Sequence, residues 1–135
     1  MFHLSNEEQL RRANLVRSAR ALAMKCLLIK PVDADSISTH FCGFHIQVSF
    51  SEQHPLFTVC LEKKIKVTKT RKLLEAVNDL NLHSVMGSHA INLEAGCYSY
   101  RAVCWLETEL TRDRMDEILD RLASEALKGY IRVSA

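Results

Sequence analysis

The sequence LLEAVNDLN at positions 73–81 is followed by SHAINL at 88–93, the turn EAGC at 94–97, YSYRAVCWL at 98–106 and TRDRMDEILDRLASEAL at 111–127. The first and last of these stretches repeat apolar residues every three or four positions, which is typical of a helix with one buried face. The two β-prone stretches between them alternate their side chains, as strands with one buried face do. The pattern predicts a helix, a two-stranded hairpin and a closing helix, packed together around a small sheet.

A further helix is predicted near the N-terminus. Ser5 followed by Glu8 forms a capping box, in which each residue satisfies a free amide group of the other. The helix must end near Ile29, because the residue before Pro31 is pushed out of helical geometry.

Two or three strands are predicted between these helices. Residues 44–50 alternate apolar and polar side chains, and residues 56–61 are almost continuously apolar, as in a more central strand. Residues 37–41 either extend the first of these strands or precede it as another strand. The order helix, two or three strands, helix, two strands, helix predicts an α+β fold, with an antiparallel sheet of about five strands and helices packed on it. We expect one domain over residues 1–135.

Composition restricts the classes of function. The formal net charge of +2 is too small to indicate a nucleic-acid partner. No apolar run is long enough to span a membrane. Five cysteines without a C-x-x-C motif do not form a complete disulfide framework or a zinc motif, so we expect reduced thiols, a cytoplasmic location, and neither a metal nor another cofactor.

Catalytic motifs are also missing. A cysteine nucleophile with a histidine base is conceivable for Cys42 with His40 or His45, or for Cys97 with His89. However, none of these residues lies in a recognisable strand–turn–helix elbow, and His40 and His45 are expected to face opposite sides of an extended segment. We therefore predict that the chain is not an enzyme, and we keep a small cysteine-dependent enzyme as the alternative.

One dense basic run precedes the helix at 73–81, and Thr68 or Thr70 is expected to cap that helix. The simpler interpretation of the run is a solvated strand edge and helix start, since lysine protects exposed edges. The other interpretation is an electrostatic contact, with nucleic acid as one conceivable partner, although the interleaved aromatic residues of a single-strand binder are missing. The candidate contact residues are Lys63, Lys64, Lys66, Lys69, Arg71 and Lys72.

The long strand carries the other candidate site. One of its faces is half polar yet includes Val103 and Trp105, as in a sheet face that is partly covered. Two interpretations remain open: Trp105 packs under the first helix, or it anchors an interface with a partner or a second copy. The candidate partner-binding or dimer residues are Tyr98, Tyr100, Arg101, Val103 and Trp105.

The runs Leu74–Asn81 and His89–Gly96 resemble the YbjN family, a group of proposed bacterial sensory transduction regulators that shares its fold with type III secretion chaperones. The motifs Leu80-Asn81 and Glu94-Ala95-Gly96 match in order, as do the longer strand and the closing helix. The resemblance implies a helix–sheet sandwich, a homodimer, and binding of a polypeptide rather than catalysis, with no catalytic residues to carry over. The chain departs from the acidic character of that family, because it is slightly basic.

Overall fold

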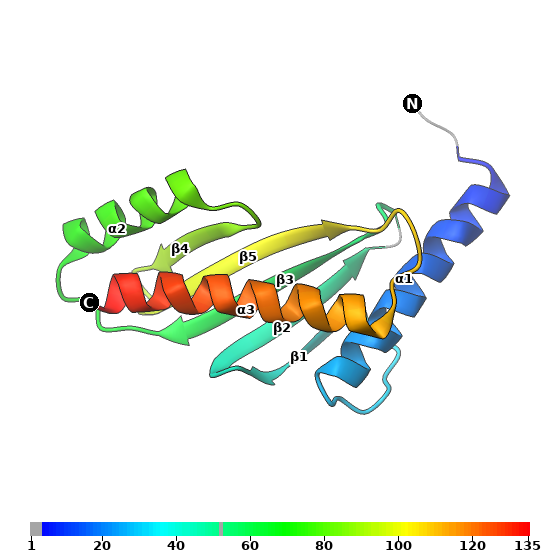
Figure 1. Cartoon of the computed structure of the whole chain (residues 1–135), viewed down its shortest axis with the longest axis horizontal. Coiled ribbons are helices and arrows are strands. Elements are labelled where there is room, and N and C mark those ends of the chain that lie inside the picture. The colour runs from blue at the N-terminus through cyan, green and yellow to red at the C-terminus, as the bar shows by residue number, and fades with distance from the viewer. Residues whose placement is uncertain (1–3, 52) are drawn as a thin grey trace.

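Within residues 4–51 and 53–135, which the computed structural model describes, three helices pack with a five-stranded antiparallel sheet (Figure 1). The expected α+β fold and element order are confirmed, and residues 37–41 form a strand of their own. The elements are α1 (Asn6–Cys26), β1 (Ser36–Phe41), β2 (Phe44–Ser51), β3 (Leu56–Lys64), α2 (Thr70–His83), β4 (Ser88–Asn92), β5 (Cys97–Trp105) and α3 (Arg112–Ser134).

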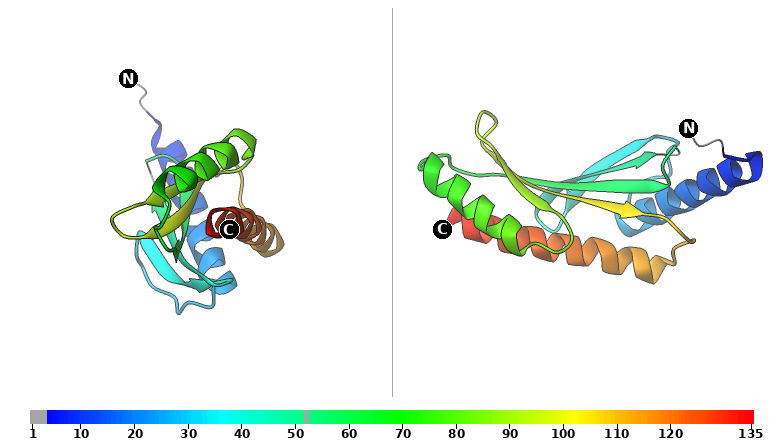
Figure 2. Two further views of the ribbon diagram at one scale, coloured as in Figure 1. Left: turned by 90° about the vertical axis from the view of Figure 1, so that its left-hand side faces the viewer. Right: turned by 90° about the horizontal axis from the view of Figure 1, so that it is seen from above.

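The strand order is β1-β2-β3-β5-β4, and every neighbouring pair is antiparallel. β3 and β5 are therefore interior strands, and β1 and β4 form the edges. Figure 2 shows that α1 and α3 lie on one side of the sheet, while α2 packs against β4 and α3 at one end of it. None of the three described helices covers the opposite side of the sheet, which we call the helix-free face.

The core lies between the sheet and α3. Alternate residues of the strands point toward the helices and are buried, and α3 presents a stripe of buried residues with three- or four-residue spacing. α1 packs through the small side chains of Ala19 and Ala23 beside Val16, which allows a close approach to its neighbours. The largest fully buried side chains include Phe44, Ile46, Phe57, Leu61, Tyr98, Tyr100, Met115, Leu119 and Leu122.

β1 and β2 are joined by a tight hairpin that the sequence analysis did not identify. Cys42 has φ 50° and Gly43 has φ 82°, so both central residues of the two-residue turn are left-handed, as the twist of a hairpin requires. His40 and His45 pair across this hairpin with their ring centroids 6.1 Å apart. The expectation that these two histidines face opposite sides was wrong, because the chain reverses direction between them.

α3 continues to Ser134, beyond the expected end near Leu127. Gly129 had the position of a helix-ending glycine, but it lies inside the helix and is buried. The apolar spacing continues past it through Val133, whose side chain is also buried. No helix in the described part of the chain is both long enough and apolar enough to cross a membrane.

Candidate functional site

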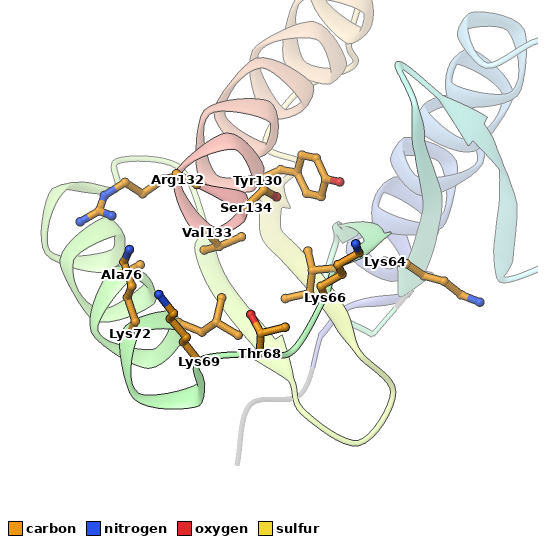
Figure 3. A pocket seen from close by; sticks show the side chains of 13 residues that line it. Lys64, Lys66, Thr68, Lys69, Lys72, Ala76, Tyr130, Arg132, Val133 and Ser134 are labelled. Carbon is orange, nitrogen blue, oxygen red and sulfur yellow. The ribbon is translucent and has the colours of Figure 1, made fainter.

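A hollow of about 590 Å³ lies between the first turns of α2 and the last turns of α3, and we call it the basic groove (Figure 3). Segments from two distant parts of the sequence form its walls. Its lining residues are Lys64, Ile65, Lys66, Thr68, Lys69, Lys72, Leu73, Ala76, Tyr130, Arg132, Val133, Ser134 and Ala135.

The fold positions the groove through the connection between β3 and α2. The amide of Ile65 donates a hydrogen bond of 2.9 Å to the carbonyl of Gly96, which ties this connection to the turn between β4 and β5. Leu73 and Ala76 are buried on α2, and Val133 is buried on α3, so apolar side chains from both helices meet at the groove. The apolar floor is therefore part of the contact between the two helices.

The rim of the groove is strongly basic. Five lysine and arginine side chains line it, whereas no aspartate or glutamate does. Arg132 lies 3.9 Å from the Asp79 carboxylate, and no ion pair joins Lys66, Lys69 or Lys72 to any described residue. In Figure 3, Lys69, Lys72 and Arg132 gather on one side of the hollow, while Lys64 points away from it. Part of the predicted basic run is thus brought together around a concave surface.

The rest of the basic run has other surroundings. Arg71 pairs with Glu75 at 3.1 Å, and the Lys63 ammonium lies 4.5 Å from the centroid of the Tyr130 ring. Neither side chain lines the groove. β3 is an interior strand, but its register with β2 ends at Glu62, so among the described strands Lys63 and Lys64 pair only with β5, through Tyr98 and Cys97. This end of β3 is therefore open on one side, as the strand-edge interpretation expects.

The start of α2 differs from the starts of the other two helices. Ser5 and Thr111 cap α1 and α3 with side-chain hydrogen bonds, and acidic residues occupy the first turns of both. The N-cap of α2 is Lys69, which makes no side-chain capping bond, and its first turn holds no acidic residue. The expected caps at Thr68 and Thr70 were wrong, because the N-cap is the residue between them and Thr70 is the first residue of the helix.

The predicted site on β5 is divided between the two faces of the sheet. Tyr98 and Tyr100 are fully buried beneath the helices, so a partner has no access to them in this conformation. Arg101, Val103 and Trp105 project from the helix-free face, where Val103 is 47% exposed and Trp105 is 63% exposed. Packing of Trp105 under α1 is therefore wrong.

The helix-free face near Trp105 forms a small patch with apolar character. In the register between β3 and β5, Leu56 lies opposite Trp105 and Thr58 lies opposite Val103. The ring of His54 makes an edge contact with Trp105, with 6.4 Å between the centroids. The role of this patch in self-association remains a prediction.

A buried polar cluster beneath α3 was missed by the sequence analysis. The ring of His89 is only 4% exposed, and its Nδ1 lies 2.6 Å from the hydroxyl of Tyr98. The side chain of Asn81 accepts from the amide of His89 at 2.7 Å and donates to its carbonyl at 2.9 Å, as a neighbouring strand would. Asn81 therefore ties α2 to β4, and no sequence pattern predicts this contact, because Asn81 and His89 meet only in the tertiary fold.

This cluster lacks the geometry of a nucleophile with its base. The single proton of the Ser84 hydroxyl is within reach of two acceptors, the Glu125 carboxylate at 2.6 Å and the carbonyl of Gly87, while the His89 Nε2 lies 4.0 Å from Glu125. Burial lowers the pKa of His89, and Glu125 acts in the opposite direction. Burial also raises the pKa of Tyr100, whose hydroxyl has no hydrogen-bond partner among the described residues. These contacts join α2, β4, β5 and α3.

None of the three conceivable cysteine–histidine pairs forms a hydrogen bond among the described residues, and Cys42 is exposed in the turn between β1 and β2. Burial and then the charge of Asp120 on α3 raise the pKa of Cys42, whereas His40 and His45 project from the helix-free face. Cys97 lies on the helix-free face, and His89 is buried on the other side. All five cysteines are free thiols, and no group of three or more potential metal ligands occurs among the described residues.

Comparison with known proteins identifies the fold. No protein-family model and no curated protein matches the chain. Among solved structures, the HopA1–SchA chaperone–effector complex is similar, with a TM-score of 0.58 and 14% identity over 98% of this chain and 100% of that chain. The chain has the fold of YbjN and of type III secretion chaperones.

Two further structures support this conclusion. YbjN from E. coli has a TM-score of 0.60 and 4% identity, with 87% of this chain and 88% of that chain covered. The ExoT–SpcS complex from Pseudomonas aeruginosa has a TM-score of 0.58 and 18% identity, with 84% of this chain and 96% of that chain covered. The expected resemblance is confirmed as a likeness of fold, because identities this low carry no information about partners.

Proposed function

We propose that the chain is a non-enzymatic module that binds a segment of another polypeptide in the basic groove. The observation that carries this proposal is the groove itself, where an apolar floor between α2 and α3 lies under a charged rim. Its volume is within the range of about 300–1,000 Å³ that binding pockets have. A groove of this kind accepts the side chains of an extended or helical segment.

The lining favours binding over chemistry. Histidine, cysteine and carboxylate side chains, which supply most catalytic bases and nucleophiles, are not among the lining residues that the structure describes. In the buried cluster, His89 is hydrogen-bonded to Tyr98, and Ser84 is hydrogen-bonded to Glu125. The similar HopA1–SchA structure is a chaperone–effector complex, which adds support from fold likeness to a binding role. Free thiols suit the reducing cytoplasm that we propose as its location.

We also propose that the module is a homodimer that pairs through the helix-free face of the sheet. Strand lengths and spacings give this face an area of about 600 Å², close to the roughly 800 Å² that each partner contributes to a standard interface. Val103 and Trp105 are the large exposed apolar side chains of β5 on it. Light scattering over a dilution series tests this part of the proposal: a dimer mass is expected, and a monomer at all concentrations would overturn it.

Site-specific photo-crosslinking in cells tests the polypeptide-binding role. A photoreactive benzoylphenylalanine replaces Thr68, which is exposed at the groove, and in a matched control it replaces Thr108, which is exposed between β5 and α3 at the other end of the molecule. We expect discrete polypeptide adducts at position 68 that are missing at position 108. Equal adducts at both positions, or none at position 68, would rule out the groove as a polypeptide site.

A further inference from the structure

We infer that the segment held in the basic groove is acidic and carries at least one large apolar side chain. This inference rests on the proposed function, because it names the class of polypeptide that the same groove binds. Two properties of the groove support it independently: the charge on its rim and the apolar character of its floor.

The positive charge of the molecule is concentrated at this groove. Of the 18 lysines and arginines, Lys66, Lys69, Lys72 and Arg132 line it and Lys64 beside them points away, although the formal net charge of the whole chain is only +2. The remaining cationic side chains are therefore outnumbered by the 16 carboxylates. Lys66, Lys69 and Lys72 have no ion pair with any described residue, so their charges are available to a ligand. A segment with several carboxylates is the complementary occupant.

The first turn of α2 adds to this positive field. A helix N-terminus favours negative groups, yet this one carries Lys69, Arg71 and Lys72 without an acidic neighbour in the first turn. Lys69 and Lys72 lie on the same side of the helix as Leu73 and Ala76, since these positions follow the three- and four-residue spacing of one helical face. Carboxylates bound at the rim would relieve the repulsion among these side chains.

The floor specifies the second property of the ligand. Leu73, Ala76 and Val133 meet at the base of the groove, with Ile65 beside them. Leu73, Ala76 and Val133 are already largely buried, so a purely ionic ligand would make no use of this apolar floor. A leucine or phenylalanine side chain inserted there buries it and gains roughly the transfer free energy of its own apolar surface.

The same groove is poorly suited to nucleic acid. Binding of a single strand relies on aromatic rings on which bases stack. Tyr130 is the aromatic side chain among the lining residues, and the Lys63 ammonium already lies over its ring, with 4.5 Å between the nitrogen and the ring centroid. These features favour a polypeptide.

Fluorescence anisotropy with labelled probes tests the inference. The first probe is a short peptide in which aspartate and glutamate surround two leucines. A second peptide replaces the acids by asparagine and glutamine, a third replaces the leucines by serine, and an oligothymidylate of equal negative charge is the fourth probe. We expect the first peptide to bind at least about tenfold more tightly than each of the others, with an affinity that falls as salt rises.

Paired variants locate the binding to the groove. Lys69→Glu with Lys72→Glu reverses two rim charges, and Lys25→Glu with Lys30→Glu makes the same change of net charge at exposed positions near the end of α1. The first pair should weaken binding of the acidic peptide at least about tenfold, and the control pair should leave it within about twofold.

Each outcome separates this inference from the proposed function. If position 68 yields adducts but the neutral peptide binds as tightly as the acidic one, polypeptide binding stands and the acidic class is wrong. Tighter binding of the oligothymidylate, or equal weakening by both pairs of variants, would also overturn the inference.

Discussion

At the scale of single residues, one close contact explains why the closing helix contains a glycine. A Cβ atom at Gly129 would overlap the hydroxyl of Tyr98 and the imidazole of His89, and both of those side chains are buried. α3 thus passes directly over the hydrogen bond between Tyr98 and His89. Glycine has a lower helix propensity than alanine, but only glycine leaves room for this close contact.

Gly129→Ala is therefore expected to destabilise the chain by about 1–3 kcal/mol, even though alanine favours helices. Unfolding by urea measures the effect. Ser124→Ala, at an exposed position on the same helix, is the control and should change stability by less than about 0.5 kcal/mol. Adding Tyr98→Phe to Gly129→Ala should recover part of the loss, because it removes the overlapping hydroxyl. A neutral or stabilising Gly129→Ala would show that α3 does not lie this close to β5.

His89 predicts how stability depends on pH. Burial lowers its pKa from 6.5 in the folded chain, so the unfolded chain binds a proton first as the pH falls. The stability that neutral His89 contributes is complete above pH 6.5 and is lost progressively below it. Thermal unfolding between about pH 7.5 and 5.5 should show this loss, and it should be much smaller in His89→Gln. The same pH dependence in both proteins would mean that His89 is not the titrating group.

At the scale of elements, the sequence predicted the helices and strands whose apolar residues are regularly spaced. The apolar spacing in α2 and α3 and the alternation in β2 and β5 identified them, and the capping box at Ser5 identified the start of α1. The hairpin at Cys42 and Gly43 was missed, because Cys-Gly is not a common turn pair. The end of α3 was placed too early, because Gly129 looks like a helix stop unless the contact with Tyr98 is known.

The candidate sites were predictable only in part, because their shape depends on contacts between residues far apart in the sequence. The basic run is visible in the sequence, but its concave shape depends on Val133 and Arg132, which lie more than 50 positions away. The alternation along β5 separated Tyr98 and Tyr100 from Val103 and Trp105, yet it did not tell which face the helices cover. Tertiary packing decides both questions.

At the start of α2, one substitution is expected to raise folding stability and weaken peptide binding at the same time. Lys69→Asp should supply the missing cap and place a negative charge at the positive end of the helix, which raises stability by about 1 kcal/mol. The same change should weaken binding of the acidic peptide. Lys30→Asp, at an exposed position outside the helices, controls for net charge in both assays. Lower stability of Lys69→Asp, or unchanged peptide binding, would contradict this account of the helix start.

At the scale of the whole molecule, the two proposed contact surfaces are separate. The helix-free face of the sheet carries Val103 and Trp105, whereas the basic groove lies where α2 meets the end of α3 (Figure 1). A dimer through the sheet face would leave the groove of each copy open. Self-association and polypeptide binding should therefore respond to different substitutions.

Trp105→Ala separates the two surfaces. The ring is 63% exposed, so its removal should cost less than about 1 kcal/mol of folding stability. It should nevertheless shift the molecule toward monomer in light scattering, since exposed tryptophans are frequent anchors of interfaces. Binding of the acidic peptide should stay within about twofold of the parent chain. A dimer of unchanged affinity would remove the sheet face as the site of self-association.

The central claim is that the groove between α2 and α3 holds an acidic polypeptide segment, and mapping of backbone amide chemical shifts tests it most directly. The ¹⁵N-labelled chain is titrated with the acidic, leucine-containing peptide. The account predicts concentration-dependent shifts confined to residues 64–76 and 130–135, the two segments that line the groove. Shifts centred on Val103 and Trp105, or no shifts at peptide concentrations that saturate the anisotropy signal, would contradict it.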